Sequence, residues 1–565
     1  MVEVLMGKVA RYTQAMIDDY VKKGFWTDQL TVDFWERNAE LYPDDEALVD
    51  STFRVTWSEG VEMVHRITAK FLDLGIKKDG VILCQLYNSV PLTLTRLACE
   101  KAGILVAIVG TKFRETEIAA VLARTQSVGA VFPAHFRRFD FFKMYSEMKE
   151  RFENLKHLFV VGESAAGGSI SFYDMMQDTY SLERFRDELD KQKFTPFEFT
   201  EITTTSGSTG IPKCVEWVAC ARLATGREYV KDLEMTRHDV VAAVSPSISG
   251  SAETLIHRTP PQLGAKTVML EHFTPEQACA LIEKEGVTAV GAVPTHLVRL
   301  VNFPGLKDYD LRTLRFIQVS GGLLPYHLGV ETEQKLSCKV VQGYGGMDIG
   351  AVAAGYLSAP QEIRLKTVGR ILRGNEVTLL DPESGEEIPQ GEVGLVTVEG
   401  PHCVGGYFQD PTATPESRMG GKFNMGDLGT VDRGGNLYLR GRVKDVIIRG
   451  GQTIYPKEIE ELLVEHPMIS EAALVRMPDV EMGEKACAVV VAKGSGSFTF
   501  EEMVSFFKER QLAPYKIPER LECVKELPLV PGGNKINKRE LEERLKAALQ
   551  SEATQESRSV DNVQG

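Results

Sequence analysis

The sequence predicts an α/β protein. We expect a large N-terminal domain of parallel sheets with helices and a small β-rich subdomain, followed by a small α+β C-terminal domain. Apolar, strand-like runs at 81–86 and 104–109 lie on either side of a helix-like segment at 92–102. Such alternation is typical of parallel strands joined by crossover helices. The chain has 565 residues, more than a single hydrophobic core holds, so two or more domains are expected.

The N-terminal elements follow from the spacing of apolar residues. Helices are expected from Tyr12 to Lys22, from Thr31 to Leu41 and from Arg114 to Thr125. Continuous apolar runs predict further buried strands at 128–132, 157–161, 240–244, 287–293 and 314–319. Two glycine-containing segments, 391–396 and 405–407, fit the small β-rich subdomain.

A charged segment, Arg442–Asp445, interrupts the structural pattern as a domain boundary does. The N-terminal domain is therefore expected to span residues 1–442 and the C-terminal domain residues 443–548. The polar residues 549–565 have no apolar periodicity, which predicts a disordered tail.

The C-terminal domain is expected to be a compact unit of strands and helices. Pro456 suits the first turn of a helix. Apolar runs at 472–475 and 488–491 predict two strands, and the pair Thr499 and Glu502 forms a capping box at the start of a second helix.

Composition excludes several classes of protein. Lys and Arg number 65 against 79 Asp and Glu, a net charge of −14, which argues against nucleic acid as the main partner. The nine cysteines are scattered singly and are expected to be reduced and mostly buried. No stretch reaches the roughly 18 apolar residues that a membrane span needs, and the N-terminus is not a convincing signal peptide. A soluble, cytoplasmic protein is expected.

The segment 203–213 is the most informative stretch of the chain. Its eleven residues include six hydroxyl side chains, two glycines and a lysine. Glycines allow backbone N–H groups to converge, hydroxyls add donors and the lysine adds positive charge, so the segment suits phosphate oxygens. A P-loop is disfavoured because Ile211 and Pro212 separate the second glycine from Lys213. A flexible linker is disfavoured by the strand-like sequences on both sides.

Residues 205–213 resemble the phosphate-binding signature of the adenylate-forming superfamily. This superfamily includes AMP-forming acyl-CoA synthetases, luciferases and peptide-synthetase adenylation domains. The resemblance implies catalytic roles for Thr205 and Lys213. It also implies that the residues between them bind the nucleotide phosphates: Ser206, Gly207, Ser208, Thr209 and Gly210.

Further motifs in the family's order imply an ATP site. Gly321 and Gly322 resemble the turn that lines the adenine, and 340–348 resembles a motif in which Tyr344 stacks on adenine beside Gly345. In that motif Asp348 stands where a glutamate holds Mg²⁺. Two departures are plain, because Met347 replaces a threonine and the Asp348 side chain is one methylene shorter than that of glutamate.

The motif at 423–429 again has methionine, Met425, where threonine is usual, but it retains Asp427. The resemblance implies that Asp427 accepts hydrogen bonds from the ribose hydroxyls. Within 441–460, the longest continuous match, it implies that Arg442 contacts ribose and phosphate and that Lys444 is the interdomain hinge. Gly450 and Gly451 would then line the tunnel for the CoA thiol.

The final motif at 527–541 resembles the loop from which a lysine reaches the α-phosphate. Lys535 is the expected catalytic residue and Lys538 the alternative, because the loop is one residue longer than usual. The lid that carries this loop is mobile in the family.

The resemblance implies an acid site at Ser249, Gly250, Pro294 and Gly346. Small residues at 249–252 favour a compact aromatic or alicyclic acid, although a tight turn would need small residues too. His296 is expected to cap or pack the start of a helix, because a carboxylate needs no general base to act as a nucleophile.

Together these features predict an AMP-forming carboxylic acid:CoA ligase that uses ATP, Mg²⁺ and coenzyme A. Two alternatives stay open. One is a stand-alone aryl-acid adenylating enzyme that loads a separate carrier protein. The other is a nucleotide-binding regulator without catalysis, suggested by the departures at Met347, Asp348, Met425 and Asn534.

Overall fold

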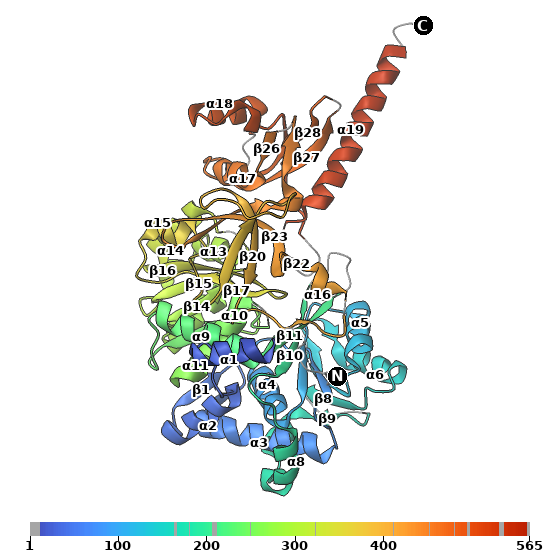
Figure 1. Ribbon diagram of the computed structural model, residues 1–565, viewed down its shortest axis with the longest axis vertical. Coiled ribbons are helices and arrows are strands. Elements are labelled where there is room, and N and C mark those ends of the chain that lie inside the picture. Colours follow the sequence, from blue (N-terminus) through green and yellow to red (C-terminus); the bar gives the residue numbers. More distant parts are fainter. Residues whose placement is uncertain are drawn as a thin grey trace.

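The computed structural model of the chain describes residues 12–162, 167–179, 181–205, 212–248, 250–322, 324–410, 412–450, 452–479, 481–493, 498–529 and 536–561. Among these residues the strands form four large sheets and a short hairpin, β6 (His135–Phe136) with β7 (Phe139–Asp140). Figure 1 shows the N-terminal elements in the lower body, the C-terminal elements above them and a long last helix that extends away from both.

The first sheet has eight strands in the order β21-β11-β10-β4-β3-β5-β8-β9 among the described residues. Neighbours from β10 to β9 are parallel, whereas β11 is antiparallel to β10 and β21 is antiparallel to β11. The bounds are β3 (Val81–Cys84), β4 (Leu105–Ile108), β5 (Gly129–Pro133), β8 (His157–Val161), β9 (Ile170–Ser171), β10 (Phe199–Thr205), β11 (Lys213–Val218) and β21 (Gly406–Tyr407).

The second sheet, in the described part of the chain, has nine strands in the order β18-β17-β16-β15-β14-β12-β13-β1-β2. Its central strands are parallel and its outer pairs antiparallel. The bounds are β1 (Glu46–Val49), β2 (Arg54–Thr56), β12 (Val240–Ala243), β13 (Lys266–Met269), β14 (Ala289–Ala292), β15 (Phe316–Val319), β16 (Lys339–Gly346), β17 (Gly350–Ala354) and β18 (Arg370–Ile371).

The helices of the N-terminal region surround these two sheets (Figure 1). Their bounds are α1 (Gln14–Lys22), α2 (Thr31–Leu41), α3 (Trp57–Asp73), α4 (Val90–Ala102), α5 (Glu115–Thr125), α6 (Phe141–Arg151), α7 (Phe172–Gln177), α8 (Arg186–Gln192), α9 (Ala219–Asp232), α10 (Gly250–Glu253), α11 (Thr259–Leu263), α12 (Pro275–Glu285), α13 (Pro294–Val301), α14 (Tyr326–Leu336), α15 (Gln361–Lys366) and α16 (Ala413–Glu416). Short 3₁₀ turns are η1 (Leu182–Phe185), η3 (Leu306–Asp308) and η5 (Pro514–Lys516), the last in the C-terminal region.

The second sheet is buried on both faces, as expected for parallel strands in an α/β fold. On β15, Phe316 belongs to the core shared with the first sheet, whereas the next residue, Ile317, packs among apolar residues of the helices on the other face, including Leu297 of α13 and Leu328 of α14. This alternation explains why the strand sequence is a continuous apolar run rather than an apolar–polar pattern.

A third, antiparallel sheet connects the N-terminal body to the C-terminal unit (Figure 1). Its strands are β19 (Glu376–Leu380), β20 (Gly394–Glu399), β22 (Arg418–Met419), β23 (Lys422–Val431) and β24 (Leu437–Arg442). The chain leaves β24 through a single 3₁₀ turn, η4 (Val443–Asp445), at the charged segment where the sequence predicts the boundary.

The C-terminal unit has its own sheet and core. The strands are β25 (Ile447–Arg449), β26 (Gln452–Ile454), β27 (Ile469–Asp479), β28 (Gly483–Ala492) and β29 (Arg520–Val524). Helices α17 (Pro456–Val464) and α18 (Phe500–Glu509) contribute Ile459 and Met503 to one core cluster, and α19 (Lys538–Asp561) contributes Leu541 to another. Pro456 begins α17, and the Thr499–Glu502 capping box begins α18, both as predicted.

Two details differ from expectation. Disorder was expected from residue 549, but the structure continues α19 to Asp561. The helix is already established before residue 549, where Leu541 and Leu545 pack in the core and a pair one turn apart, Arg539–Glu543 at 2.9 Å, stabilises it. Residues 405–407 were assigned to the β-rich subdomain, and this is wrong: β21 pairs with β11 at the edge of the first sheet.

The cysteines fit the prediction, because all nine are free and every one except Cys523 is buried. Within the described residues, no helix combines the length and the apolar character that crossing a membrane requires.

Candidate functional site

The predicted site motifs lie at the carboxyl ends of parallel strands. Pro294 follows β14, Gly321 and Gly322 follow β15, and Tyr344 lies near the end of β16. These three strands are parallel neighbours, so their ends share one edge of the second sheet. Ligands in open α/β sheets bind at this edge.

The predicted phosphate loop joins two strands, as the sequence indicated. Thr205 ends β10 and Lys213 begins β11, and the two residues are directly opposite each other in the antiparallel pair. The predicted phosphate-binding residues Ser206, Gly207, Ser208, Thr209 and Gly210 lie outside the described residues. The hairpin nevertheless fixes both ends of the loop.

Tyr344 connects the second sheet to the third. Its hydroxyl donates a hydrogen bond of 2.8 Å to Oδ2 of Asp427 on β23. Oδ1 of the same carboxylate forms an ion pair with Nε of Arg442, 3.0 Å away, and Arg442 also donates to the Met425 carbonyl at 2.8 Å. Burial raises the pKa of Tyr344 and the Asp427 carboxylate raises it further, so the phenol stays protonated.

Asp348 lies in the turn between β16 and β17, and a residue of the first sheet holds it. The Tyr407 hydroxyl donates to Oδ2 of Asp348 at 3.0 Å, and Nζ of Lys213 lies 4.8 Å from the centroid of the Tyr407 ring. The sequence motifs predicted Asp348 and Lys213 but missed Tyr407. The available signal was the glycine pair Gly405-Gly406 in front of it, because glycines also flank Tyr344.

The two groups of side chains are contiguous. A Cβ at Gly346 would stand 2.4 Å from the Met425 sulfur and 3.1 Å from Oδ1 of Asp348. Gly346 therefore lies between the Tyr344–Asp427–Arg442 group and the Asp348–Tyr407–Lys213 group, and only a glycine fits there without displacing Met425.

Asp348 suits a Mg²⁺ ion that a nucleotide brings with it. Mg²⁺ is usually held by one or two carboxylates together with substrate phosphates and water rather than by an all-protein cage. Among the described residues there is no cluster of three or more His, Cys, Asp or Glu side chains that could hold a metal. A single carboxylate beside the hairpin that is predicted to bind phosphate meets the Mg²⁺ requirement, whereas it would not suit Zn²⁺.

Glycine is required at several of the predicted positions. Gly321 has φ of +75°, and a Cβ at Gly322 would lie 3.4 Å from the Pro294 ring, so the two turns at the sheet edge touch. A Cβ at Gly345 would lie 2.3 Å from the Gly350 carbonyl, which explains Gly345 by hairpin closure rather than by a ligand.

The predicted acid wall is partly described. Ser249 lies outside the described residues, and Gly250 begins α10, which packs against β14, β16 and β17. A π-helical turn, η2 (Thr254–Arg258), follows directly. π-helical turns are rare and are frequent at functional sites.

A buried ionic cluster includes this turn and the elements that pack against it. Its members are all at most 5% exposed: Arg96, Glu100, Glu201, Arg222, Glu253 and Arg258. Nε of Arg258 lies 2.8 Å from Glu253, and its Nη2 lies 2.6 Å from Glu201. Burial alone would raise the pKa of Glu253, but the three arginine charges outweigh it and hold that pKa well below its ordinary value. A hollow of about 10 Å³ beside the cluster has room for roughly one water.

His296 lies in the first turn of α13 and packs as expected. Its ring is stacked on Phe273 at a centroid distance of 4.1 Å. Burial and the nearby Arg299 charge lower the pKa of His296 to about 4. The side chain is therefore neutral and enclosed at physiological pH.

The residues predicted for the lid and the thiol tunnel are only partly described. The Lys444 carbonyl in η4 accepts a hydrogen bond from Arg476 of the C-terminal unit. Gly450 has φ of +54° at the tip of the β25–β26 hairpin. Gly451 and Lys535 lie outside the described residues, and Lys538 forms an ion pair with Glu460 at 2.6 Å.

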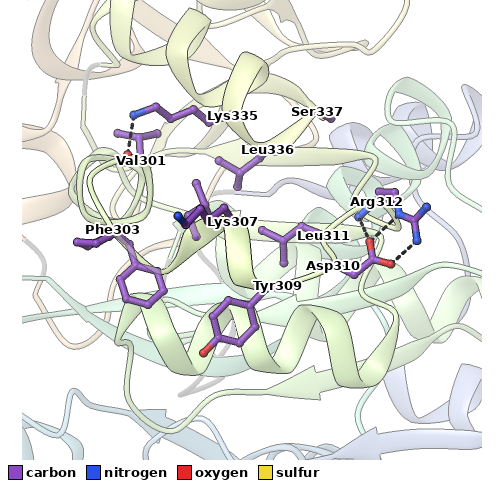
Figure 2. Close-up of a pocket in the computed structure, with 12 residues that line it drawn as sticks. Val301, Phe303, Lys307, Tyr309, Asp310, Leu311, Arg312, Lys335, Leu336 and Ser337 are labelled. Atoms are coloured by element: carbon purple, nitrogen blue, oxygen red, sulfur yellow. Dashed lines mark hydrogen bonds and ion pairs between the residues drawn. The ribbon is translucent and has the colours of Figure 1, made fainter.

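A surface hollow of about 540 Å³ lies elsewhere on the molecule (Figure 2). It is lined by Val301 and Leu336, at the last turns of α13 and α14, and by residues that precede β15, such as Tyr309. These lie at the opposite ends of helices and strands from Pro294 and Gly321. The hollow is therefore separate from the candidate site.

Comparison with known proteins identifies the family. A family model described as AMP-binding enzyme matches residues 35–408, and one described as AMP-binding enzyme C-terminal domain matches residues 458–534. The chain belongs to the adenylate-forming superfamily of AMP-binding enzymes. The predicted family and α/β fold class are thereby confirmed.

Relatives within the AMP-binding enzymes cover nearly the whole chain. The medium-chain fatty-acid–CoA ligase of Escherichia coli (strain K12) is 30% identical over 527 residues, 92% of this chain and 91% of that protein. The 2-hydroxy-7-methoxy-5-methyl-1-naphthoate–CoA ligase of Streptomyces carzinostaticus is 29% identical over 550 residues, 94% of each chain.

The solved structure of the amide bond synthetase McbA from Marinactinospora thermotolerans has a TM-score of 0.78 at 24% identity, covering 91% of this chain and 99% of that one. This likeness shows that the chain has the same fold as that structure.

Proposed function

We propose that the protein is an AMP-forming carboxylic acid:CoA ligase, which converts a carboxylic acid, ATP and CoA to acyl-CoA, AMP and pyrophosphate. Membership of the AMP-binding enzymes supports the adenylation half of the reaction. Two relatives named as CoA ligases support the thioester half. Nine free cysteines fit a reducing compartment such as the cytoplasm.

In the first half-reaction a carboxylate oxygen attacks the α-phosphorus of ATP, the bond from that phosphorus to the bridging oxygen breaks, and pyrophosphate leaves with the electron pair. Two anions must be held in line, so cations and N–H donors at fixed positions contribute most of the rate. Lys213 and the Thr205 hydroxyl at the ends of the hairpin loop, with the backbone N–H groups of 206–210, would bind the β- and γ-phosphates. Lys535 would bind the α-phosphate.

The nucleoside would lie along the edge of the second sheet. Gly321 and Gly322 allow a flat ring to approach the backbone, and Tyr344 would stack on the adenine beside Gly345. Asp427 would accept hydrogen bonds from the ribose hydroxyls, with Arg442 beside it. A bound Mg²⁺ ion neutralises phosphate charge, and Asp348 is the carboxylate that would hold it.

In the second half-reaction the CoA sulfur attacks the acyl carbon, the bond from that carbon to the AMP oxygen breaks, and the thiol proton passes to solvent. The C-terminal unit, residues 443–548, would rotate about Lys444. The tip of the β25–β26 hairpin at Gly450 and Gly451 would then replace Lys535 at the site. Support for this comes from the single turn, η4, that joins the two parts of the chain.

The acid is proposed to be a compact aromatic or alicyclic carboxylic acid of the benzoate or cyclohexene-carboxylate type. Small residues at 249 and 250 would leave room for a ring, and Pro294 and Gly346 are the further residues proposed to contact the acid. The relative named for a naphthoate supports an aromatic acid, whereas the relative named for medium-chain fatty acids does not. A panel of acids compared by pyrophosphate release discriminates these classes; best turnover with medium-chain or long-chain acids would overturn the ring preference and leave the ligase reaction intact.

One observation supports the proposal most strongly. Tyr407 contacts both Asp348, in the turn after β16, and Lys213, at the end of the phosphate-loop hairpin. It brings two motifs separated by more than a hundred positions to one place. The test is to incubate purified protein with ATP, Mg²⁺, CoA and an acid, and to measure pyrophosphate, AMP and acyl-CoA. Acid-dependent formation of all three in equal amounts is the expected result.

Other outcomes support the alternatives. AMP and pyrophosphate without thioester, followed by acylation of a carrier protein's phosphopantetheine, would indicate a carrier-loading enzyme. ATP binding without acid-dependent AMP would indicate a regulator that has lost catalysis.

A further inference from the structure

Tyr407 connects the two parts of the candidate site that face the nucleotide phosphates. Its hydroxyl donates to Asp348 at 3.0 Å, and its ring faces the ammonium of Lys213 at 4.8 Å. The residue is 7% exposed, so neither contact is an accident of a solvated side chain. Neither the sequence motifs nor the family resemblance assigned Tyr407 a role.

The backbone of Tyr407 is held firmly. It pairs with Val215, two residues after Lys213, and its N–H donates to the Thr414 hydroxyl at 3.0 Å. Gly406 before it has φ of +141°, which only glycine adopts readily. The phenol therefore reaches towards Asp348 from a fixed position on β21.

The hairpin that carries Asp348 is held against the same segment. The Ala351 N–H donates to the His402 carbonyl at 3.1 Å, and the Val404 N–H donates to the Ile349 carbonyl at 3.3 Å. The segment 402–407 thus runs from the Asp348 turn to the strand that begins at Lys213. A displacement of one hairpin relative to the other would break the phenol–carboxylate bond.

We propose that Tyr407 is a positioning residue that orients the Asp348 carboxylate for Mg²⁺ and fixes it relative to the phosphate-loop lysine, Lys213. The inference rests on the proposed function in one respect, that Asp348 holds the metal. The phenol binds Oδ2 and so anchors one carboxylate oxygen, while Oδ1 lies on the Gly346 side.

The proposal also accounts for aspartate at position 348. An aspartate reaches one methylene less far than a glutamate and cannot extend to meet the metal, so the position at which its carboxylate is held matters more. Hydrogen-bond partners of metal-binding carboxylates orient them, and their loss costs roughly 10- to 100-fold in metal affinity. A longer side chain at position 348 would reach the metal with less help.

The test compares four proteins: the wild type, Tyr407→Phe, Tyr407→Phe with Asp348→Glu, and Tyr438→Phe as the matched control. Tyr438, on β24, also lies near an aspartate, Asp432, but has no part in the site. Mn²⁺ binding in the presence of a non-hydrolysable ATP analogue is measured by electron paramagnetic resonance, and thermal unfolding is measured without ligands. Neither readout needs turnover.

Tyr407→Phe is expected to weaken Mn²⁺ binding about 10-fold, the effect of one hydrogen bond to a charged group. Its unfolding temperature should stay near that of the wild type, because the ring and its packing remain. Asp348→Glu in the same background should recover most of the loss, and Tyr438→Phe should bind Mn²⁺ as the wild type does.

Wild-type Mn²⁺ binding by Tyr407→Phe would overturn the inference, and so would a loss that Asp348→Glu leaves unrepaired. These outcomes are separable from failure of the proposed function. If the wild-type protein bound Mn²⁺ with the ATP analogue but formed no acyl-adenylate with any acid, the ligase assignment would fall while the role of Tyr407 in metal binding would still be decided by the variants.

Discussion

The Tyr344 hydroxyl and the Asp427 carboxylate, 83 positions apart, are joined by a hydrogen bond of 2.8 Å. This bond connects the parallel second sheet to the antiparallel third sheet at the edge where the site motifs meet. A carboxylate has about four acceptor positions, so Asp427 can accept from Tyr344 and still accept from a ribose. Under the proposed function, Tyr344 would therefore have two separable roles, a ring that stacks on adenine and a hydroxyl that orients Asp427.

Substitutions at Tyr344 should separate these functions. Tyr344→Phe keeps the ring and loses one hydrogen bond to a charged group, which predicts an increase in the KM for ATP of about 10-fold. Tyr344→Ala also loses base stacking worth about 1–3 kcal/mol, which predicts a further increase in this KM of about 10-fold or more. Steady-state kinetics with varied ATP measures both. Equal effects of the two substitutions would show that the ring does not contact adenine; Tyr326→Phe, at an exposed position on α14, is the control.

The two lysines of the last motif should differ sharply. Lys535→Ala is expected to lower the rate of adenylation about 100-fold or more, because a positive charge at the reacting phosphorus is lost. The variant should still form thioester from supplied acyl-adenylate. Lys538 is already paired with Glu460 at 2.6 Å, so Lys538→Ala should leave both half-reactions nearly unchanged. The half-reactions are assayed separately. The reverse pattern would assign the catalytic role to Lys538.

The buried ionic cluster should be sensitive to the loss of one charge. Glu253→Gln removes one of the two carboxylates, Glu253 and Glu201, that pair with the buried guanidinium groups of Arg222 and Arg258, and breaking a buried pair costs about 3–5 kcal/mol. Urea unfolding followed by tryptophan fluorescence reports this, because all four tryptophans are buried in the N-terminal region. The control is Glu62→Gln, which removes an exposed pair with Arg66 and should cost about 0.5 kcal/mol or less. A loss below 1 kcal/mol for Glu253→Gln would contradict the description of the cluster.

Glu100 predicts a pH dependence of stability. Burial raises the pKa of its carboxyl to about 7, against the opposing effects of Arg258 and the Val32 N–H. A carboxyl whose pKa rises on folding destabilises the folded chain as the pH rises from its unfolded value of about 4.3 to about 7. Between pH 5 and pH 8, the free energy of unfolding of Glu100→Gln should therefore rise by up to about 3 kcal/mol relative to that of the wild type.

The check is the difference in unfolding free energy between this variant and wild type at each pH, since the buried histidines affect both proteins alike. The glutamine carbonyl can still accept from Val32. A difference that stayed constant with pH would mean that Glu100 titrates near its ordinary value in the folded chain.

Local pattern predicted the strands and helices well, because strands buried on both faces are continuous apolar runs and helices with one buried face repeat apolar residues at helical spacing. The run at 157–161 became β8 and the segment from Thr31 to Leu41 became α2 with the predicted bounds. The predicted phosphate loop, Tyr344 and Asp348 could be singled out as candidates because glycines and hydroxyls in a short motif have few other uses.

Partners between distant segments could not be predicted in the same way. Tyr407 follows a glycine pair that suited an antiparallel subdomain, and nothing local indicates that β21 pairs with β11 or that its phenol reaches Asp348. The buried cluster was missed for a related reason, since Arg96, Glu201 and Arg258 lie on three separate elements, and each alone is typical of a surface residue. The tail beyond residue 549 was expected to be disordered because it lacks apolar periodicity, and that pattern does not show whether a helix that begins upstream, at Lys538, continues through it.

The most direct measurement of the central claim is a crystal structure of the protein with a non-hydrolysable ATP analogue and Mg²⁺. The account predicts an adenine ring on Tyr344, ribose hydroxyls at Asp427, a metal ion at Asp348, and β- and γ-phosphates inside the hairpin loop that ends at Lys213. A nucleotide bound away from Tyr344 and the 205–213 loop would contradict it.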